Sequence, residues 1–127
     1  MSLLLFVGFG GAAGAMFRYL SVEAIRFALG PGFPFGTLFV NVLGSFLAGL
    51  LAGVLIDNPV LSERTHAFLM IGFLGGYTTF SAFSLDVWHL IESGRIGLAV
   101  LYIALSTILA LTFLVLGLLL ARHQGIP

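Results

Sequence analysis

Four long apolar segments constrain this chain more than any other feature. They run from about Leu3 to Leu29, Phe35 to Ile56, Thr65 to Ile91 and Leu98 to Leu120. A helix needs about 20 mostly apolar residues to cross the hydrocarbon core of a bilayer, and each segment meets that length. We therefore predict an all-α membrane protein in which residues 1–127 form one domain of four transmembrane helices.

Turn signals separate the four segments. The stretch GPGFP at 30–34 divides the first from the second, because proline lacks a backbone donor and glycine favours turns. Asp57-Asn58-Pro59 ends the second segment, and the stretch ESGR at 92–95 ends the third. The first segment lacks the positively charged start of a signal peptide, so we expect it to be a retained helix.

The composition excludes several classes of function. The chain is 60% hydrophobic and 8% charged, whereas soluble domains are about 25% charged. Its formal net charge is zero and it has no basic run, so it offers no electrostatic attraction for nucleic acid. It contains no cysteine, which excludes disulfides and thiol chemistry. The lipid bilayer is the partner that this composition predicts.

The arginines give no clear instruction about orientation. With four spans, Arg64 and Arg122 lie on one side of the membrane, and Arg26 and Arg95 lie on the other, to which Arg18 adds at most one charge. The side richer in Lys and Arg normally stays cytoplasmic, and here the two sides are nearly balanced. Two interpretations follow: another factor sets the orientation, or both orientations are made and pair as an antiparallel dimer.

Small residues at helical spacing predict close contacts between helices. Three G-x-x-x-G pairs occur, which are Gly10 with Gly14, Gly49 with Gly53, and Gly72 with Gly76. For any single pair, packing within one subunit is the simpler interpretation. Four short helices bury little surface among themselves, so we also expect an oligomer.

Most polar side chains expected at membrane depth are neutral. Ionisable residues near span ends, such as Glu23, Arg26 and Asp86, are expected to reach the interface. Arg18 is expected to lie deeper and to have a structural role. An unpaired buried amide costs several kcal/mol, so Asn41 must face something polar. Tyr102 and Ser106 are four residues apart and should share one helix face.

The stretch GGYTTFSAFS, residues 75–84, interrupts the third apolar segment with five hydroxyl groups and two glycines. Glycine is poor in helices and neighbouring β-branched threonines add strain, so we predict a broken helix between Gly75 and Thr79. Non-helical backbone at membrane depth is tolerated only where it is buried in protein or lines a wet cavity or ion site. Freed carbonyls would suit a cation, and freed amides and hydroxyls would suit an anion.

Two phenylalanines follow the predicted break. Phe80 and Phe83 are three residues apart and should project from one face of the resumed helix. A phenylalanine ring has an electropositive edge that can approach an anion. In a chain with 13 phenylalanines, core packing is the simpler explanation, but the neighbouring polar atoms favour an ion site of undetermined sign.

With these features the chain resembles the small bacterial fluoride channels of the Fluc family. The resemblance rests on Gly75-Gly76-x-Thr78-Thr79-Phe80-Ser81-x-Phe83-Ser84, on Asn41 in a Val-Asn-x-x-Gly setting, and on Tyr102 with Ser106. It implies a multi-pass protein of the bacterial cytoplasmic membrane that exports fluoride passively. It also implies an antiparallel, dual-topology homodimer with two pores and one central structural sodium ion.

The resemblance also assigns residues. The backbone carbonyls of Gly75 and Thr78 would hold the sodium ion, and Arg18 would be structural. The fluoride pore would be lined by Asn41, Phe80, Phe83, Thr79, Tyr102 and Ser106. The family often has a further serine one turn beyond Ser106, where this chain has Ala110.

Two other functions fit the sequence less well. A small multidrug-type, proton-coupled exporter needs an acid deep in its first span, and this chain has none there before Glu23. A non-transporting membrane scaffold would explain the glycine pairs but not a broken helix beside Asn41. We expect the protein not to be an enzyme, because no hydroxyl has a general base in its sequence neighbourhood.

Overall fold

The protein is all-helical, and four of its segments are long and apolar enough to cross a membrane. This computed structural model describes residues 2–57 and 63–123, so the predicted turn at Asn58-Pro59 lies outside the described residues. The first two spans are α1 (Leu3–Leu29) and α2 (Phe35–Asp57). The third comprises α3 (Glu63–His66), the π-helical η1 (Ala67–Leu74), α4 (Gly75–Tyr77) and α5 (Phe80–Glu92), and α6 (Ile96–His123) is the fourth.

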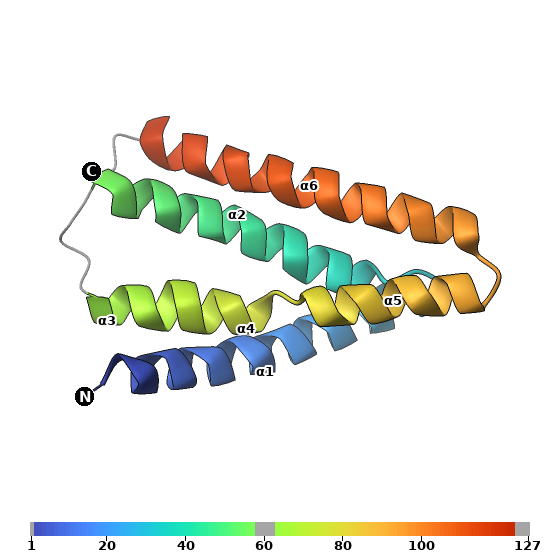
Figure 1. Cartoon of the computed structure of the whole chain (residues 1–127), viewed down its shortest axis with the longest axis horizontal. Coiled ribbons are helices and arrows are strands. Elements are labelled where there is room, and N and C mark those ends of the chain that lie inside the picture. Colours follow the sequence, from blue (N-terminus) through green and yellow to red (C-terminus); the bar gives the residue numbers. More distant parts are fainter. Residues whose placement is uncertain (1, 58–62, 124–127) are drawn as a thin grey trace.

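The helices pair in two groups. Figure 1 shows α2 and α6 side by side and running in the same direction, while α1 lies along the first half of the third span. The beginning of α1 and the end of α6 lie at the same end of the molecule. At the opposite end, Leu90, Ala99 and Tyr102 form a buried cluster where α5 meets α6. This cluster fixes the second half of the third span against the fourth span.

Two glycines end helices as the turn signals predict. Gly30 has φ 81° and its amide donates to the Arg26 carbonyl at 2.7 Å, which ends α1. Gly94 has φ 77° and its amide donates to the Ile91 carbonyl at 3.0 Å, just after α5. Both values lie in the left-handed region that favours glycine after a helix.

All three G-x-x-x-G pairs pack within the subunit. A Cβ added to Gly10 or Gly14 would collide with η1 backbone carbonyls, those of Phe68 and Phe73. Gly72 and Gly76 meet α1 in the same way, and Gly49 and Gly53 meet α6. Because glycine has no side chain, the helix backbones touch directly at these positions. The three pairs therefore support packing within one subunit, the simpler interpretation of the sequence pattern.

The third span changes conformation at two residues. Thr78 has φ −87° and ψ 158°, and Thr79 has φ −152° and ψ 120°, so both are extended between α4 and α5. The Thr79 hydroxyl then accepts a hydrogen bond from the Ala82 amide at 3.1 Å and caps α5. The predicted interruption began at Gly75, but Gly75 and Gly76 are helical, so the extended stretch is narrower. Gly76 provides room for the Gly11 carbonyl of α1.

Candidate functional site

The side-chain amide of Asn41 holds the extended stretch of the third span. Its Oδ1 accepts a hydrogen bond from the Thr79 amide at 2.8 Å, and its Nδ2 donates to the Thr79 carbonyl at 3.0 Å. Asn41 lies on α2, which passes beside the junction of α4 and α5. The expectation that this amide faces something polar is confirmed, and the residue is half-buried. The Asn41 side chain binds both the backbone amide and the backbone carbonyl of Thr79.

This contact redirects the backbone groups around it. The Thr79 amide would donate to the Gly75 carbonyl in a continuous helix, but it donates to Asn41 instead. The Gly76 carbonyl accepts from Nε of Arg18 at 3.1 Å, in place of an amide of its own helix. Arg18 thus has a structural contact on the third span. The carbonyls of Gly75 and Thr78 sit at a helix end where backbone acceptors lack their usual partners.

A groove of about 550 Å³ gathers most of the predicted site residues. It lies between α2, the third span and α6, and its lining includes Asn41, Gly75, Thr78, Thr79, Phe80, Phe83 and Ser106. Residues from three spans therefore line one space. Tyr102 is the predicted pore residue that does not line this groove, because its side chain is completely buried.

Ser106 carries an unusual hydroxyl group in this groove. The residue is 8% exposed, and its Oγ has no hydrogen-bond partner among the described residues. A buried hydroxyl without a partner costs about 1–3 kcal/mol, so this position favours a ligand or a water molecule that can accept its proton. Asn41, Ser106 and the rings of Phe80 and Phe83 line the same groove. This donor set, without any fixed positive charge, suits a small anion.

The aromatic rings form a row that leads away from the groove. The centroids of Phe80 and Phe83 are 5.5 Å apart, and Phe83 lies 5.1 Å from the ring of Tyr102. Phe80 is 79% exposed on the isolated chain, so its ring is available to a partner or an ion. Phe83 is half-buried against the cluster that contains Tyr102. Phe83 therefore links the groove to the buried end of the row.

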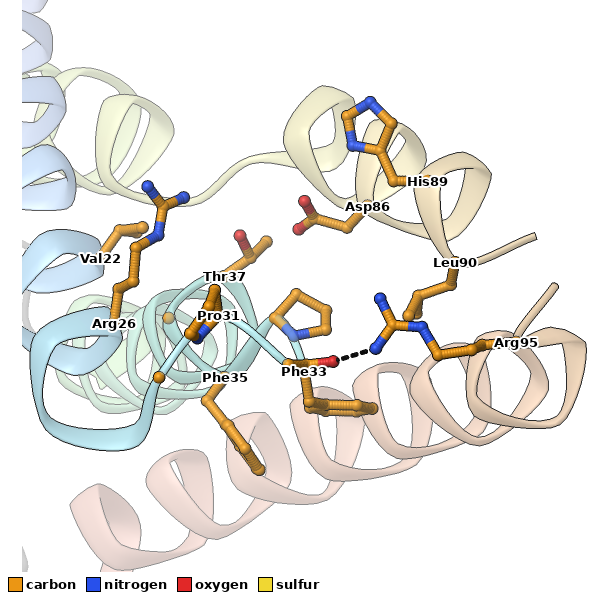
Figure 2. A pocket seen from close by; sticks show the side chains of 14 residues that line it. Val22, Arg26, Pro31, Phe33, Phe35, Thr37, Asp86, His89, Leu90 and Arg95 are labelled. Atoms are coloured by element: carbon orange, nitrogen blue, oxygen red, sulfur yellow. Dashed lines mark hydrogen bonds between the residues drawn. The ribbon is translucent and has the colours of Figure 1, made fainter. Parts of the chain in front are cut away.

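Tyr102 connects this row to a second cavity. Its hydroxyl donates to Oδ2 of Asp86 at 3.0 Å, and Asp86 lines a cavity of about 260 Å³. Figure 2 shows Asp86, Thr37, Arg26, His89 and Arg95 around this cavity. The Phe83 and Tyr102 rings thus lie between an uncharged groove and a charged cavity at the end of the spans.

One contact joins two connections at the mouth of the second cavity. Nη1 of Arg95, which follows α5, donates to the Gly32 carbonyl of the α1–α2 connection at 2.6 Å (Figure 2). Nε of Arg95 also donates to Oγ of Ser93 at 3.2 Å. Arg95 thereby fixes the position of the GPGFP turn relative to the end of the third span.

Sequence reasoning missed the part that Asp86 takes in this arrangement. We expected Asp86 to extend toward the interface, but it is half-buried and bonded to Tyr102. The two residues are 16 positions apart on different helices, so no local spacing reveals the pair. The available signal was Asp86 itself, because an acid within a span tends to have a polar partner.

Comparisons with known proteins identify the family. A family profile described as CrcB-like protein, Camphor Resistance (CrcB), matches residues 5–118. The chain belongs to the CrcB-like family. It is 52% identical over 125 residues to a protein of Phenylobacterium zucineum (strain HLK1) named "Fluoride-specific ion channel FluC", covering 97% of this chain and 98% of that protein.

Two further CrcB-like relatives carry the same name. The protein from Cereibacter sphaeroides (strain ATCC 17029 / ATH 2.4.9) is 49% identical over 122 residues, covering 96% of each chain. The one from Rhizobium meliloti (strain 1021) is 47% identical over 122 residues, covering 96% of this chain and 98% of that protein. The family match spans every site residue described above, so the resemblance noted in the sequence to the small fluoride channels is confirmed at the level of the family.

Proposed function

We propose that this chain is a fluoride-selective channel of the bacterial cytoplasmic membrane that lets fluoride leave the cytoplasm passively. The observation that carries the proposal is the buried Ser106 hydroxyl, which has no partner among the described residues and lines the same groove as Asn41, Phe80 and Phe83. The names of the relatives supply the identity of the anion, since the groove alone supports only a small anion.

The chemistry of the groove suits fluoride better than chloride. Fluoride is small and strongly hydrated, so a selective path must replace its water with several short hydrogen bonds. The groove offers hydroxyls, an amide and ring edges, and none of its lining residues is charged. A fixed arginine in the groove would also hold chloride. Weak neutral donors allow the ion both to enter and to leave.

The charged cavity marks one end of the proposed pathway. An ion that passes the rings of Phe83 and Tyr102 reaches the cavity lined by Arg26, Asp86 and Arg95. The two guanidinium groups attract an anion toward this mouth, whereas the Asp86 carboxylate opposes its retention there. The cavity therefore serves as the place where the ion regains water.

We propose further that two copies assemble in antiparallel orientation. The groove and the exposed ring of Phe80 give one chain only part of an enclosed path. The extended residues Thr78 and Thr79 lie near the middle of the third span, so the breaks of two antiparallel copies would meet near the membrane midplane. The near balance of arginines between the two ends allows both orientations. Such a dimer has two equivalent fluoride pathways.

The backbone near the break suits the proposed sodium ion. Hard cations prefer oxygen ligands, and the helical partner of the Gly75 carbonyl is diverted to Asn41. Thr78 is extended, so its carbonyl points out of the α4 ladder. When bound, sodium would neutralise the facing carbonyl dipoles of the two copies. The Gly76 carbonyl is already used by Arg18, which leaves Gly75 and Thr78 as the proposed ligands.

The first span, α1, gives little support to the alternative function of a proton-coupled exporter. Its acid, Glu23, lies in the last two turns of the helix and forms an ion pair with Arg26 at 3.4 Å, with both side chains largely exposed. A proton-coupled exporter would need a buried acid facing its substrate. A non-transporting scaffold would not explain why the buried Ser106 hydroxyl has no hydrogen-bond partner in the described part of the chain.

Ion efflux from liposomes tests the proposed function. The purified protein is reconstituted into liposomes that contain equal concentrations of potassium fluoride and potassium chloride, and valinomycin starts the efflux. A fluoride electrode and a chloride electrode record the two ions in the same sample. We expect rapid fluoride release with chloride retained. Equal release of both ions, or release of neither, would overturn the proposal.

A further inference from the structure

We propose that Ser45 of α2 supplies the anion-binding hydroxyl that follows Ser106 along the groove, so that the fluoride path passes from α6 to α2. This inference rests on the proposed function and adds a binding position to it. Ser45, Asn41, Ser106 and Ala110 all line the 550 Å³ groove. The ligand is a small, strongly hydrated anion that accepts short hydrogen bonds.

The lining of the groove changes character beyond Ser106. Along α6 the groove residues that follow Thr107 toward its C-terminal end are Ala110, Leu111 and Leu114, which offer no side-chain donor. One helical turn is about 5.4 Å, so an anion that leaves Ser106 in this direction would lose its side-chain donors on α6. Removing a small anion from water without replacing its hydrogen bonds is very costly. A path in this direction needs a donor from another helix.

Two contacts between α2 and α6 set the level of Ser45. The rings of Phe46 and Phe113 lie 6.3 Å apart, and a Cβ added to Gly49 would collide with the Leu114 carbonyl. The two helices run in the same direction (Figure 1). Ser45 precedes Phe46 by one residue and Gly49 by one turn. It therefore lies at the level of α6 residues 110–112, where α6 has Ala110 in the groove.

Ser45 also lies on the correct face of α2. It follows Asn41 by four residues, so both side chains project from the same side of the helix. Gly49 allows α2 to touch the α6 backbone directly, and Gly117 does the same one turn later with the Phe46 carbonyl. This close approach brings the groove face of α2 near that of α6. The Ser45 hydroxyl can therefore continue the line that Asn41 and Ser106 begin.

The other hydroxyls that line the groove near this level already take part in hydrogen bonds within their own segments. Thr107 donates to the Ile103 carbonyl of its own helix at 2.9 Å. Thr78 donates to the Leu74 carbonyl at 2.9 Å. Oγ1 of Thr79 accepts from the Ala82 amide at 3.1 Å and lies 3.3 Å from Oγ of Ser81 at the start of α5. Ser45 is thus the hydroxyl best placed to donate to an anion beyond Ser106.

Exchange of the hydroxyl between the two helices tests this inference. Fluoride efflux is measured for the wild-type protein, for Ser45→Ala and for the double variant Ser45→Ala with Ala110→Ser. We expect Ser45→Ala to reduce efflux at least about tenfold, because it removes a hydrogen bond to a charged ligand. The double variant should recover most of that loss, since the new hydroxyl on α6 lies at the same level. Thr112→Ala, at this level but outside the groove lining, is the matched control and should conduct as wild type.

The outcomes separate this inference from the proposed function. Wild-type efflux in Ser45→Ala, or low efflux that Ala110→Ser does not recover, overturns the role of Ser45 while the channel function stands. Absence of fluoride efflux from the wild-type protein overturns the channel function and the inference with it. If Ser45→Ala does not elute as the wild-type oligomer, Ser45→Cys keeps the volume with a weak donor and should also conduct poorly. Full efflux in Ser45→Cys would overturn the inference as well.

Discussion

Asn41 combines two tasks that one amide group can perform. Its carbonyl oxygen accepts from the Thr79 amide and its nitrogen donates to the Thr79 carbonyl, so it replaces the helical bonds that the extended residue has lost. An amide nitrogen has two protons, and the Thr79 carbonyl uses one of them. We propose that the second proton is donated to fluoride.

Replacement of Asn41 by aspartate tests both tasks. A carboxylate can still accept from the Thr79 amide, but it cannot donate to the Thr79 carbonyl and would repel that oxygen. It also places a negative charge beside the proposed anion path. We expect Asn41→Asp to reduce fluoride efflux by at least about a hundredfold, which corresponds to roughly 2.7 kcal/mol. Liposome efflux checks the flux and size-exclusion chromatography checks assembly. Unchanged flux in a well-assembled protein would remove Asn41 from the pathway.

The ring of Phe80 gives a second prediction at the residue scale. Isoleucine keeps an apolar side chain at position 80 but has no electropositive ring edge. We expect Phe80→Ile to lower fluoride efflux at least about tenfold, the equivalent of one aromatic contact of about 1.4 kcal/mol. Phe27 is 95% exposed on α1 and outside both cavities, so Phe27→Ile is the matched control. Equal losses in the two variants would show that the effect is not specific to the ring at position 80.

At the scale of elements, the third span shows what sequence reasoning can and cannot resolve. Apolar length and turn residues were enough to predict four spanning segments, because both signals are local. The limits of the extended stretch were not predictable from Gly75 and Gly76. Glycine can either give the backbone conformational freedom or allow another helix to pack closely. Here Gly76 allows close packing against Gly11 of α1. The sequence does not distinguish these two uses.

Contacts between distant elements were also beyond the sequence. The bond between Asp86 and Tyr102 joins α5 to α6, and the bond between Arg95 and Gly32 joins two connections. Each of these contacts depends on how whole helices are placed relative to one another, and no local sequence pattern predicts that placement. The π-helical geometry of η1 was not predicted either. By contrast, Asn41 could be singled out, because an amide at membrane depth requires a polar partner wherever the helices lie.

The packing of α1 on the third span yields a prediction at this scale. A Cβ on Gly14 would collide with the Phe73 carbonyl, so Gly14→Val must force the two helices apart. Overpacking of this kind costs about 1–3 kcal/mol, which should lower the thermal midpoint by roughly 5 °C or more. A Cβ on Gly8 would meet no atom within 4 Å in the described part of the chain, so Gly8→Val is the control. A similar midpoint for both variants in detergent would contradict this packing.

At the scale of the whole molecule, the single chain buries little of its apolar surface. Among large side chains, Tyr102 and Val40 are the fully buried ones in the described residues. Many leucines and phenylalanines on all the spans remain exposed, and lipid or a second copy must cover them. Arg26 and Arg95 belong to one end and Arg64 and Arg122 to the other, so the arginine count gives no strong signal for one orientation.

Dual topology predicts a specific labelling pattern. The chain has no cysteine, so a single cysteine can be placed without background labelling. Ser2 precedes α1 and Ile96 begins α6, and both are exposed; Figure 1 shows the starts of α1 and α6 at opposite ends of the molecule. With a membrane-impermeant maleimide on intact cells, we expect about half of Ser2→Cys and about half of Ile96→Cys to be labelled. Full labelling of one variant and none of the other would show a single orientation.

The reversal potential of the open channel in a planar bilayer tests the central claim most directly. One chamber contains tenfold more fluoride than the other, and chloride replaces the difference so that ionic strength is equal. If fluoride alone permeates passively, the current reverses at about 59 mV, and a superimposed pH gradient leaves that value unchanged. Reversal near zero would show that chloride passes equally well, and a shift with pH would show proton coupling. Either result would contradict a fluoride-selective channel.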